Sequence, residues 1–212
     1  MSVDGLLPIS KFACEEQLCD VLGVASLGEA IEIRKKLPSL KTDIYVFSDT
    51  GLMFADAVEL YVDYGVVPVI SHLDDLKTFL SHQFLKNFPL LLKVDTGMHR
   101  LGVGTEELED VIRLLKSHGK RTINHLMTHF SSSYIPLREN DKTNRQYDSF
   151  LKFKSGLRDS GIEVEETSCA NSGAIEQGLS LEESHIRPGL MLYGPTSSGR
   201  WAGKTISSLK TH

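Results

Sequence analysis

Hydrophobic and polar positions follow a repeated unit along the chain. Each unit is a short run rich in aliphatic residues, then a polar turn, then a longer segment with helical spacing. In the first unit the run at 22–26 precedes a segment in which Leu27, Ala30, Ile31 and Arg34 recur at helical intervals. Further runs predict strands at 43–48, 66–70, 90–95, 123–130, 167–171 and 186–194. Helical patterns at 54–64, 73–84, 106–118 and 144–160 fill most of the gaps.

This alternation predicts the fold class. Strands separated by single helices pair in parallel through right-handed crossovers, so the sequence indicates an α/β protein. Seven strand candidates favour a (β/α)8-type TIM barrel over a small open sheet. No low-complexity linker interrupts residues 1–195, which we expect to form one domain, whereas residues 196–212 change to a Gly-, Ser- and Thr-rich tail with a possible strand at 205–209.

Composition and net charge limit the kinds of molecule that the protein is expected to bind. The chain has 212 residues, 41% of them hydrophobic and 24% charged, which is typical of a globular protein with a substantial core. A net charge of -5 gives no basic field for nucleic acid or a membrane surface. There is no signal-peptide pattern and no apolar stretch of membrane-spanning length, so we expect a cytoplasmic protein. Cys14, Cys19 and Cys169 have no metal-type spacing and are interpreted as small buried hydrophobic residues.

The stretch LLLKVDTGMHRLGV at 90–103 is the most unusual part of the pattern. A buried strand tolerates Lys93 and Asp95 only if they pair or meet a polar group. In parallel α/β folds, ligands bind just beyond the carboxyl ends of the strands. The predicted strand ends supply Arg100 and Arg187, but no carboxylate pair and no Walker-type loop. These residues predict a site for a small anionic ligand.

Three patterns in sequence order carry a resemblance to a known family: KVDTGMHRLGV at 93–103, MTHF at 127–130, and ANSGA followed by IRPGLMLYG between 170 and 194. Together they resemble the alanine racemase family, whose larger domain is a (β/α) barrel that holds pyridoxal 5'-phosphate. The early segments LGVASLGEAIEIRK and VVPVISHLDDL are also similar to that family. The resemblance therefore implies this cofactor for residues 1–195.

The resemblance assigns roles to residues around the cofactor ring. Arg100 matches the arginine that contacts the phenolic oxygen, and Lys93 matches a lysine that can be carbamylated and so orient that arginine. A plain Lys93–Asp95 pair on one strand face is an equally open interpretation. His129 matches the histidine stacked on the ring. Its alternative, a metal site shared with His125, fails because four residues of strand separate the two by ~13 Å, so we expect no metal.

The resemblance also implies a cradle for the ring nitrogen and the phosphate. Arg187 matches the arginine that faces the pyridine nitrogen. A permanently charged donor there favours simple proton removal and return over other reactions of the cofactor. Asn171, Ser172, Gly189 and Leu190 match positions around the phosphate. For Asn171 and Ser172 alone, a helix cap is the alternative interpretation.

Two bases that the family uses have no clear counterpart here. One is the cofactor-bearing lysine of the first barrel strand, and the other is a tyrosine of a second domain. In the preferred register, residues 7–26 match the helix after that first strand and the strand that follows. In a second register, residues 5–11 form the first strand and Lys11 ends it. We therefore expect an incomplete barrel whose first strand is missing or replaced, without the second domain, and with open edges that favour a homodimer or larger assembly.

These observations give three candidate functions. The first is an alanine racemase-like enzyme that interconverts L- and D-alanine, or a similar amino acid, with very low or no activity in this chain. The second is a non-catalytic barrel that binds pyridoxal phosphate or phosphate without covalent attachment. The third, less favoured, is a hydrolase that uses Ser131, Ser132 or Ser133 beside His129, although such serines are more often loop residues.

Overall fold

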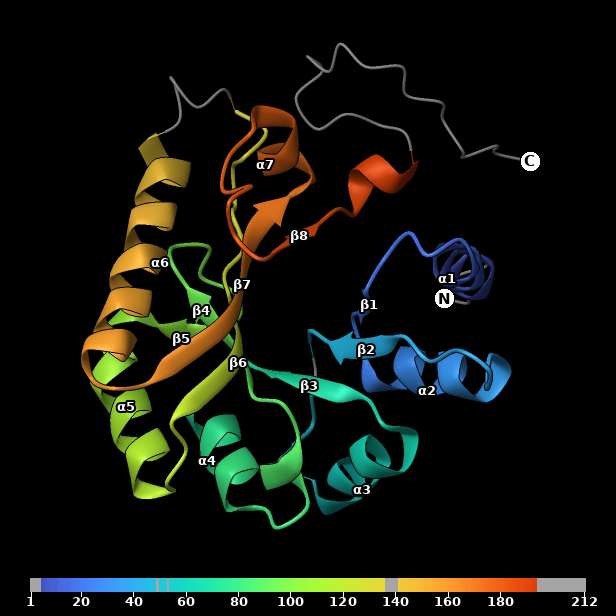
Figure 1. The fold of residues 1–212 in the computed structure, drawn as a ribbon, viewed down its shortest axis with the longest axis horizontal. Helices are drawn as coiled ribbons and strands as arrows, with labels where there is room; N and C mark the ends of the chain where they lie inside the picture. The colour runs from blue at the N-terminus through green and yellow to red at the C-terminus, as the bar shows by residue number, and fades with distance from the viewer. Residues whose placement is uncertain (1–4, 49, 53, 136–140, 194–212) are drawn as a thin grey trace. The chain divides into compact units, whose positions relative to one another are not determined.

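A computed structural model describes residues 5–48, 50–52, 54–135 and 141–193 of the chain. It divides into two compact units, Met1–Leu91 and Leu92–His212. Both units repeat a strand followed by a helix, as Figure 1 shows by the colour sequence along the chain.

The first unit contains three parallel strands covered by helices. Its sheet has the order β1-β2-β3, and α2 contacts β1 and β2. Its core is aliphatic and aromatic, and every residue of β3 is buried. The elements are α1 (Leu6–Glu15), β1 (Val21–Val24), α2 (Leu27–Lys36), β2 (Asp43–Val46), α3 (Ala55–Tyr64), β3 (Val67–Ile70), α4 (Leu73–Ser81) and the 3-10 turn η1 (Leu85–Asn87).

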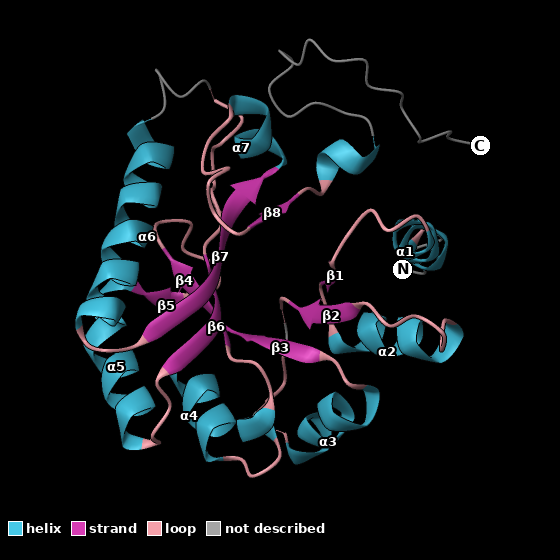
Figure 2. Cartoon of the chain, viewed as in Figure 1, coloured by secondary structure: helices cyan, strands magenta, loops and turns pink. Residues whose placement is uncertain are grey.

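The second unit carries the remaining strands in the order β4-β6-β7-β8, with the short β5 parallel to β4. Helices α5 and α6 pack on each other, and α6 packs on β7 (Figure 2). The elements are β4 (Leu91–Asp95), β5 (Val103–Gly104), η2 (Thr105–Glu107), α5 (Leu108–Ser117), β6 (Thr122–Met127), α6 (Asp141–Asp159), β7 (Glu163–Asn171), α7 (Ser172–Gln177), β8 (His185–Arg187) and η4 (Leu190–Tyr193).

Strand register gives this second sheet one polar face. His125 is the cross-strand partner of Glu166, and Ser168 is the partner of His185. Because side chains alternate along a strand, residues two apart join their cross-strand partners on the same side. We call this surface the polar face, made of His125, Glu166, Ser168, His185 and Arg187.

The structure decides between the two N-terminal registers. Leu6–Glu15 is a helix, and Val21–Val24 is the strand that follows it. The preferred register is therefore confirmed at this point. The second register, which made residues 5–11 a strand ending at Lys11, is wrong. Lys11 lies in the middle of α1, its side chain is 58% exposed, and its amine is 3.8 Å from the carboxylate of Glu15.

The bounds of two predicted strands differ most from those observed. β7 begins at Glu163 rather than residue 167, because its polar first half was taken for a loop. The run at 186–194 is strand only to Arg187, and Leu190–Tyr193 is a 3-10 turn. Pro188 lacks the N–H that would continue the ladder, which explains the early end. The predicted tail at 196–212 lies outside the described residues.

Two smaller expectations can also be compared with the structure. Cys169 is fully buried as predicted, but Cys14 and Cys19 are partly exposed, so their interpretation as buried residues is wrong. A search of the described residues finds no helix with the length and hydrophobicity needed to cross a membrane.

Candidate functional site

The loop after β4 is organised by one carboxylate. Asp95 accepts hydrogen bonds from the backbone N–H groups of Gly97, Met98, His99 and Arg100, at 2.8, 2.8, 3.1 and 3.0 Å. Burial acts to raise the pKa of Asp95, but these four donors outweigh it and hold the pKa below its ordinary value. We call residues 95–100 the Asp95 loop. Its carboxylate is occupied by its own backbone.

Glycine is required where the chain leaves this loop. Gly102 has φ +135°, and a Cβ there would lie 2.4 Å from the backbone nitrogen of Asp95. No side chain fits that approach. The close packing holds the end of the Asp95 loop against β4.

Two threonines join the Asp95 loop to the end of β6. The hydroxyls of Thr96 and Thr128 are 2.8 Å apart. Thr128 Oγ1 also donates to the carbonyl of Val94 at 2.9 Å. The two strand ends are thereby fixed relative to each other, which brings Arg100 and His129 to one edge of the sheet. Thr128 was not recognised as a site residue from the sequence.

Lys93 is a buried cation with little compensation. It is 6% exposed, and within the described part of the chain its amine makes no hydrogen bond or ion pair. Burial first, and then the charges of Arg100 and Arg187, lower its pKa to about 8, while Asp95 acts weakly in the opposite sense. The plain Lys93–Asp95 ion pair that was left open does not form, because the Asp95 carboxylate serves the backbone instead.

Arg187 is held rigidly at the end of β8. Its guanidinium donates to the hydroxyl of Ser168 and to the carbonyl of Thr128, with a longer contact of 3.5 Å to the carbonyl of Cys169. Burial lowers its pKa to about 10, which still leaves it charged at neutral pH. The guanidinium is therefore a fixed, permanently charged group.

His129 stands near all three cations. Burial, followed by Arg187, Lys93 and Arg100, lowers its pKa to about 4, so the imidazole is neutral at neutral pH. Its backbone carbonyl accepts from Gln146 of α6 at 3.3 Å. The ring nitrogen Nε2 lies 3.5 Å from the amide nitrogen of Asn171. These contacts hold a neutral ring at the strand edge.

Two of the residues predicted to surround a phosphate, Asn171 and Ser172, have side chains engaged in hydrogen bonds. Asn171 caps α7, its Oδ1 accepting from the backbone N–H of Ala174 at 3.2 Å, so the cap interpretation is confirmed for this residue. The Ser172 hydroxyl accepts from the backbone N–H groups of Gly189 and Met191 at 3.0 and 3.2 Å, which joins the start of α7 to the turn after β8. Leu190 begins that turn and is exposed.

The part of the second sheet near the carboxyl ends of its strands carries excess positive charge, from Lys93, Arg100 and Arg187. The pKa values of Lys93 and His129 both respond to Arg100 and to Arg187, so the structure brings these four residues within electrostatic reach of one another. The nearest carboxylate, Asp95, is already saturated by backbone donors. Such an arrangement favours binding of an anion that can accept hydrogen bonds.

The serines after His129 are occupied by loop contacts. Ser131 uses its N–H and hydroxyl to reach the Gln146 side-chain oxygen at 3.0 and 3.2 Å, and Ser133 donates to Asn171 at 2.5 Å. Their geometry does not support the hydrolase interpretation.

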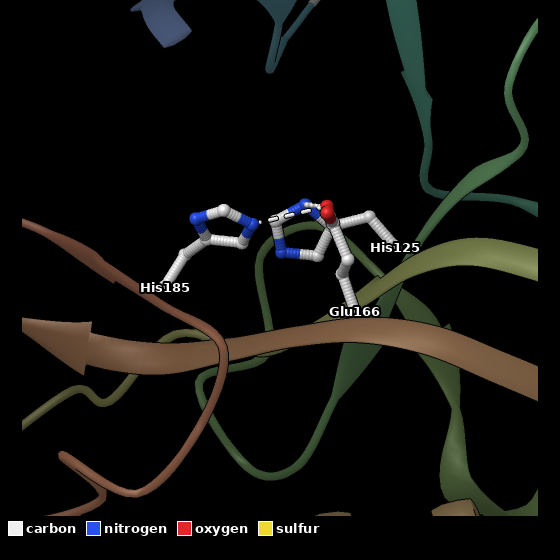
Figure 3. Close-up of side chains that lie close together, drawn as sticks. All are labelled: His125, Glu166 and His185. Carbon is white, nitrogen blue, oxygen red and sulfur yellow. Dashed lines mark ion pairs between the residues drawn. The ribbon is translucent and has the colours of Figure 1, made fainter. Parts of the chain in front are cut away.

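One cluster was missed entirely by sequence reasoning. His125, Glu166 and His185 converge on the polar face (Figure 3). His125 was considered only with His129, four residues later in the sequence, whereas its partners come from β7 and β8, the next two strands of the sheet. The alternation of residues 163–168 offered the one available signal, since it places Glu166 on the same face as Ser168.

Comparison with known proteins gives one consistent family. The family model described as "Alanine racemase, N-terminal domain" matches residues 4–197. An alanine racemase of Rickettsia bellii is 31% identical over 195 residues, covering 90% of this chain and 44% of the relative. Another, from Shewanella amazonensis, is 31% identical over 176 residues, covering 82% of this chain and 45% of the relative.

Solved structures of alanine racemases have a fold similar to that of this chain. Alanine racemase from Oenococcus oeni superposes with a TM-score of 0.72 at 29% identity, covering 94% of this chain and 56% of that one. Alanine racemase from Bartonella henselae with covalently bound pyridoxal phosphate has a TM-score of 0.79 at 23% identity, covering 96% of this chain and 56% of that one. The likeness confirms the predicted fold class, an incomplete (β/α) barrel. The chain spans about half the length of the curated relatives it matches.

Proposed function

Because the chain belongs to the alanine racemase family, we propose that residues 1–195 form the cofactor-holding domain of a pyridoxal 5'-phosphate-dependent racemase that acts on alanine or a similar small amino acid. The observation that carries the proposal is the set of three cations, Lys93, Arg100 and Arg187, gathered at the strand ends beside a neutral histidine. A cytoplasmic location and a homodimeric or larger assembly stay part of this proposal.

The residues present fit the cofactor. Its phosphate and phenolic oxygen are anionic acceptors. The described residues offer three cations near one another, and the Asp95 carboxylate beside them is occupied by its own backbone. The backbone at Gly189 leaves room for close approach, since a Cβ built there would meet nothing within 4 Å. We propose that Asn171, Ser172, Gly189 and Leu190 surround the phosphate, although Asn171 contributes mainly by capping α7.

Each ring-facing residue then has a distinct task. When bound, pyridoxal phosphate supplies an electron sink that makes the α-proton of an amino acid removable. Arg187, charged and held by three hydrogen bonds, presents N–H donors and no acceptor to a ring nitrogen, which keeps that nitrogen unprotonated. The neutral His129 presents a ring face, and Arg100 a donor for the phenolic oxygen. The arrangement favours proton removal and return.

We propose that Lys93 carries a carbamate. Its lowered pKa of about 8 leaves part of the amine unprotonated near neutral pH. An unprotonated Nζ attacks the carbon of carbon dioxide, so that an N–C bond forms while one C–O π bond opens to give a carboxylate oxygen. The nitrogen then releases a proton to water, and the product is an anion within electrostatic reach of Arg100. Labelled bicarbonate followed by carbon-13 NMR detects that carbon directly. A carbamate signal is expected in the unaltered chain and in Lys86→Met, a change of a lysine in η1, but not in Lys93→Met. A signal that survives in Lys93→Met would assign it elsewhere.

We also propose that these 212 residues alone have very low or no racemase activity. Lys11, which the second register placed at the family's lysine position, lies on an exposed helix face and pairs with Glu15. Borohydride reduction with the cofactor, followed by mass spectrometry, is expected to leave no pyridoxyl adduct on Lys11. Turnover of L-alanine to D-alanine by the purified chain would contradict this part of the proposal and favour the enzyme over the non-catalytic binding alternative.

Cofactor titration tests the site itself. Loss of one charge-assisted contact is worth ~1.5–3 kcal/mol, so Arg187→Gln and Arg100→Gln should each weaken cofactor binding by roughly 10- to 100-fold. Arg113→Gln, on the exposed face of α5, is the matched control and should bind as the unaltered chain does. Equal affinity for all three variants would remove the basis of the proposal.

A further inference from the structure

A second cluster of ligand-type side chains lies on the polar face, which also carries Arg187. His125 comes from β6, Glu166 from β7 and His185 from β8, so three neighbouring parallel strands each contribute one residue. In Figure 3 the Glu166 carboxylate lies beside the His125 ring, and dashed lines join it to both histidines. The polar face therefore presents three donors around one point.

The distances are those of a site that can close around an ion. Glu166 Oε2 is 3.0 Å from His185 Nε2 and 3.9 Å from His125 Nδ1, and all three ligand atoms lie within 4.8 Å of one another. Zinc bonds of ~2.0–2.1 Å in a tetrahedral site place ligand atoms roughly 3.3 Å apart. Small rotations of these side chains would reach that spacing.

The kind of donor selects the kind of ion. Two imidazole nitrogens and one carboxylate suit zinc and its first-row neighbours, whereas magnesium and calcium prefer sites made of oxygen alone. We propose that His125 Nδ1, the Glu166 carboxylate and His185 Nε2 bind one divalent first-row transition ion, with zinc the best match. Three protein ligands leave a coordination position open to water or a small ligand.

A hydrogen bond to the nitrogen of His125 that does not face Glu166 holds this buried ring in the required orientation. The other nitrogen of His125, Nε2, lies 2.8 Å from the Ser168 hydroxyl. Ser168 is itself held by the guanidinium of Arg187. Such outer contacts orient metal-ligating histidines, and their loss typically weakens binding by roughly 10- to 100-fold. The edge of the His125 ring that carries Nδ1 is thus kept toward Glu166.

Charge makes Glu166 the decisive ligand. Arg187 lies close to His125 and opposes any cation on this face, and Glu166 is the negative group within the cluster. The Glu166 and His185 side chains are 47% and 28% exposed, which gives an ion a path from solvent. His125, at 6%, forms the closed end of the site.

Metal titration of the untagged 212-residue chain, first stripped with a chelator, tests the proposal without any cofactor. Calorimetry with zinc should show one ion per chain, and cobalt should give the intense visible absorption of a four-coordinate site. Glu166→Gln and His185→Gln should each lose this binding. Both changes are at accessible positions, and far-ultraviolet circular dichroism checks that each variant is folded.

Glu165→Gln is the matched control. It removes a carboxylate from the adjacent position of β7, where Glu165 accepts from the Asn124 side chain on the opposite face. It should bind zinc as the unaltered chain does. The proposal is overturned if the unaltered chain binds no zinc or cobalt, or if Glu165→Gln loses as much binding as Glu166→Gln.

Discussion

The two units are built from the same strand–helix repeat but bury different chemistry. In the described part of the first unit, the buried polar side-chain groups include the hydroxyls of Ser10, Thr50, Tyr61 and Ser71, and β3 is wholly apolar. The second unit buries an ammonium group, Lys93, and an imidazole, His125. Burying such groups opposes folding unless they are paired. The first unit is therefore organised for packing, and the second gives up stability to hold charge.

The largest effect is expected from damage to the packed unit. Phe79 of α4 is fully buried, and Phe79→Ala should lower the free energy of unfolding by about 3–5 kcal/mol through lost burial and a cavity. Urea unfolding followed by circular dichroism measures this change. Phe84→Ala, at a position that is 51% exposed in the same unit, should have little effect. Similar losses in both variants would mean that the first unit is not a tightly packed body.

The opposite sign is expected for Lys93 in the second unit. The pKa of the free Lys93 amine is about 8 in the folded chain and 10.5 ordinarily. In buffer without cofactor or carbon dioxide, where Lys93 carries no carbamate, Lys93→Met should therefore stabilise the chain by about 3 kcal/mol at neutral pH. The unfolded chain binds more protons between these values, so stability of the unaltered chain rises with pH from about 8 to 10.5. The variant should lack this rise. A destabilised variant would show that Lys93 makes favourable contacts instead.

A smaller loss is expected at the Asp95 loop, where the second unit does pair its charge. Asp95→Asn weakens hydrogen bonds to a charged acceptor and should lower the free energy of unfolding by about 1.5–3 kcal/mol. Because the native pKa lies below the ordinary value, this stabilisation is full above that ordinary value and is lost as pH falls through the native pKa. Unfolding midpoints measured from neutral to acidic pH report it. Asp110→Asn, on the surface of α5, should shift them little.

The smallest effect is expected at a helix end of the first unit. Ser26 and Glu29 form a reciprocal capping box at the start of α2. Ser26→Ala should lower the free energy of unfolding by about 1 kcal/mol, since one backbone donor loses its partner. The exposed Ser81 near the end of α4 provides Ser81→Ala for comparison in the same urea assay. An effect as large as that of Phe79→Ala would contradict the view that apolar burial dominates this unit.

Most of the fold could be predicted from local patterns in the sequence. The helices after Ser26 and before Gly65 follow from apolar spacing and from capping residues that act within a few positions. The polar half of β7 was missed because Glu163, Glu165 and Glu166 look like loop residues until the neighbouring strand supplies partners.

The candidate site was predictable where its parts are close in sequence. The unusual pairing of Lys93 and Asp95 in an apolar run pointed to the site directly, although not to the backbone donors that Asp95 collects. The convergence of His125, Glu166 and His185 depends on strand register across three elements. No spacing in the sequence encodes that distance, so only the structure reveals it.

The Asp95 loop also bears on the order in which the molecule acquires its shape. All four of its amide donors come within five residues of the carboxylate, so closing it restricts very little chain. Closures of this size take roughly 10–100 ns, far less than the assembly of strands distant in sequence. The Asp95 loop, which bears Arg100, can therefore form before the segments with Thr128 and Arg187 fold. The later strands then pack against a loop that has already formed.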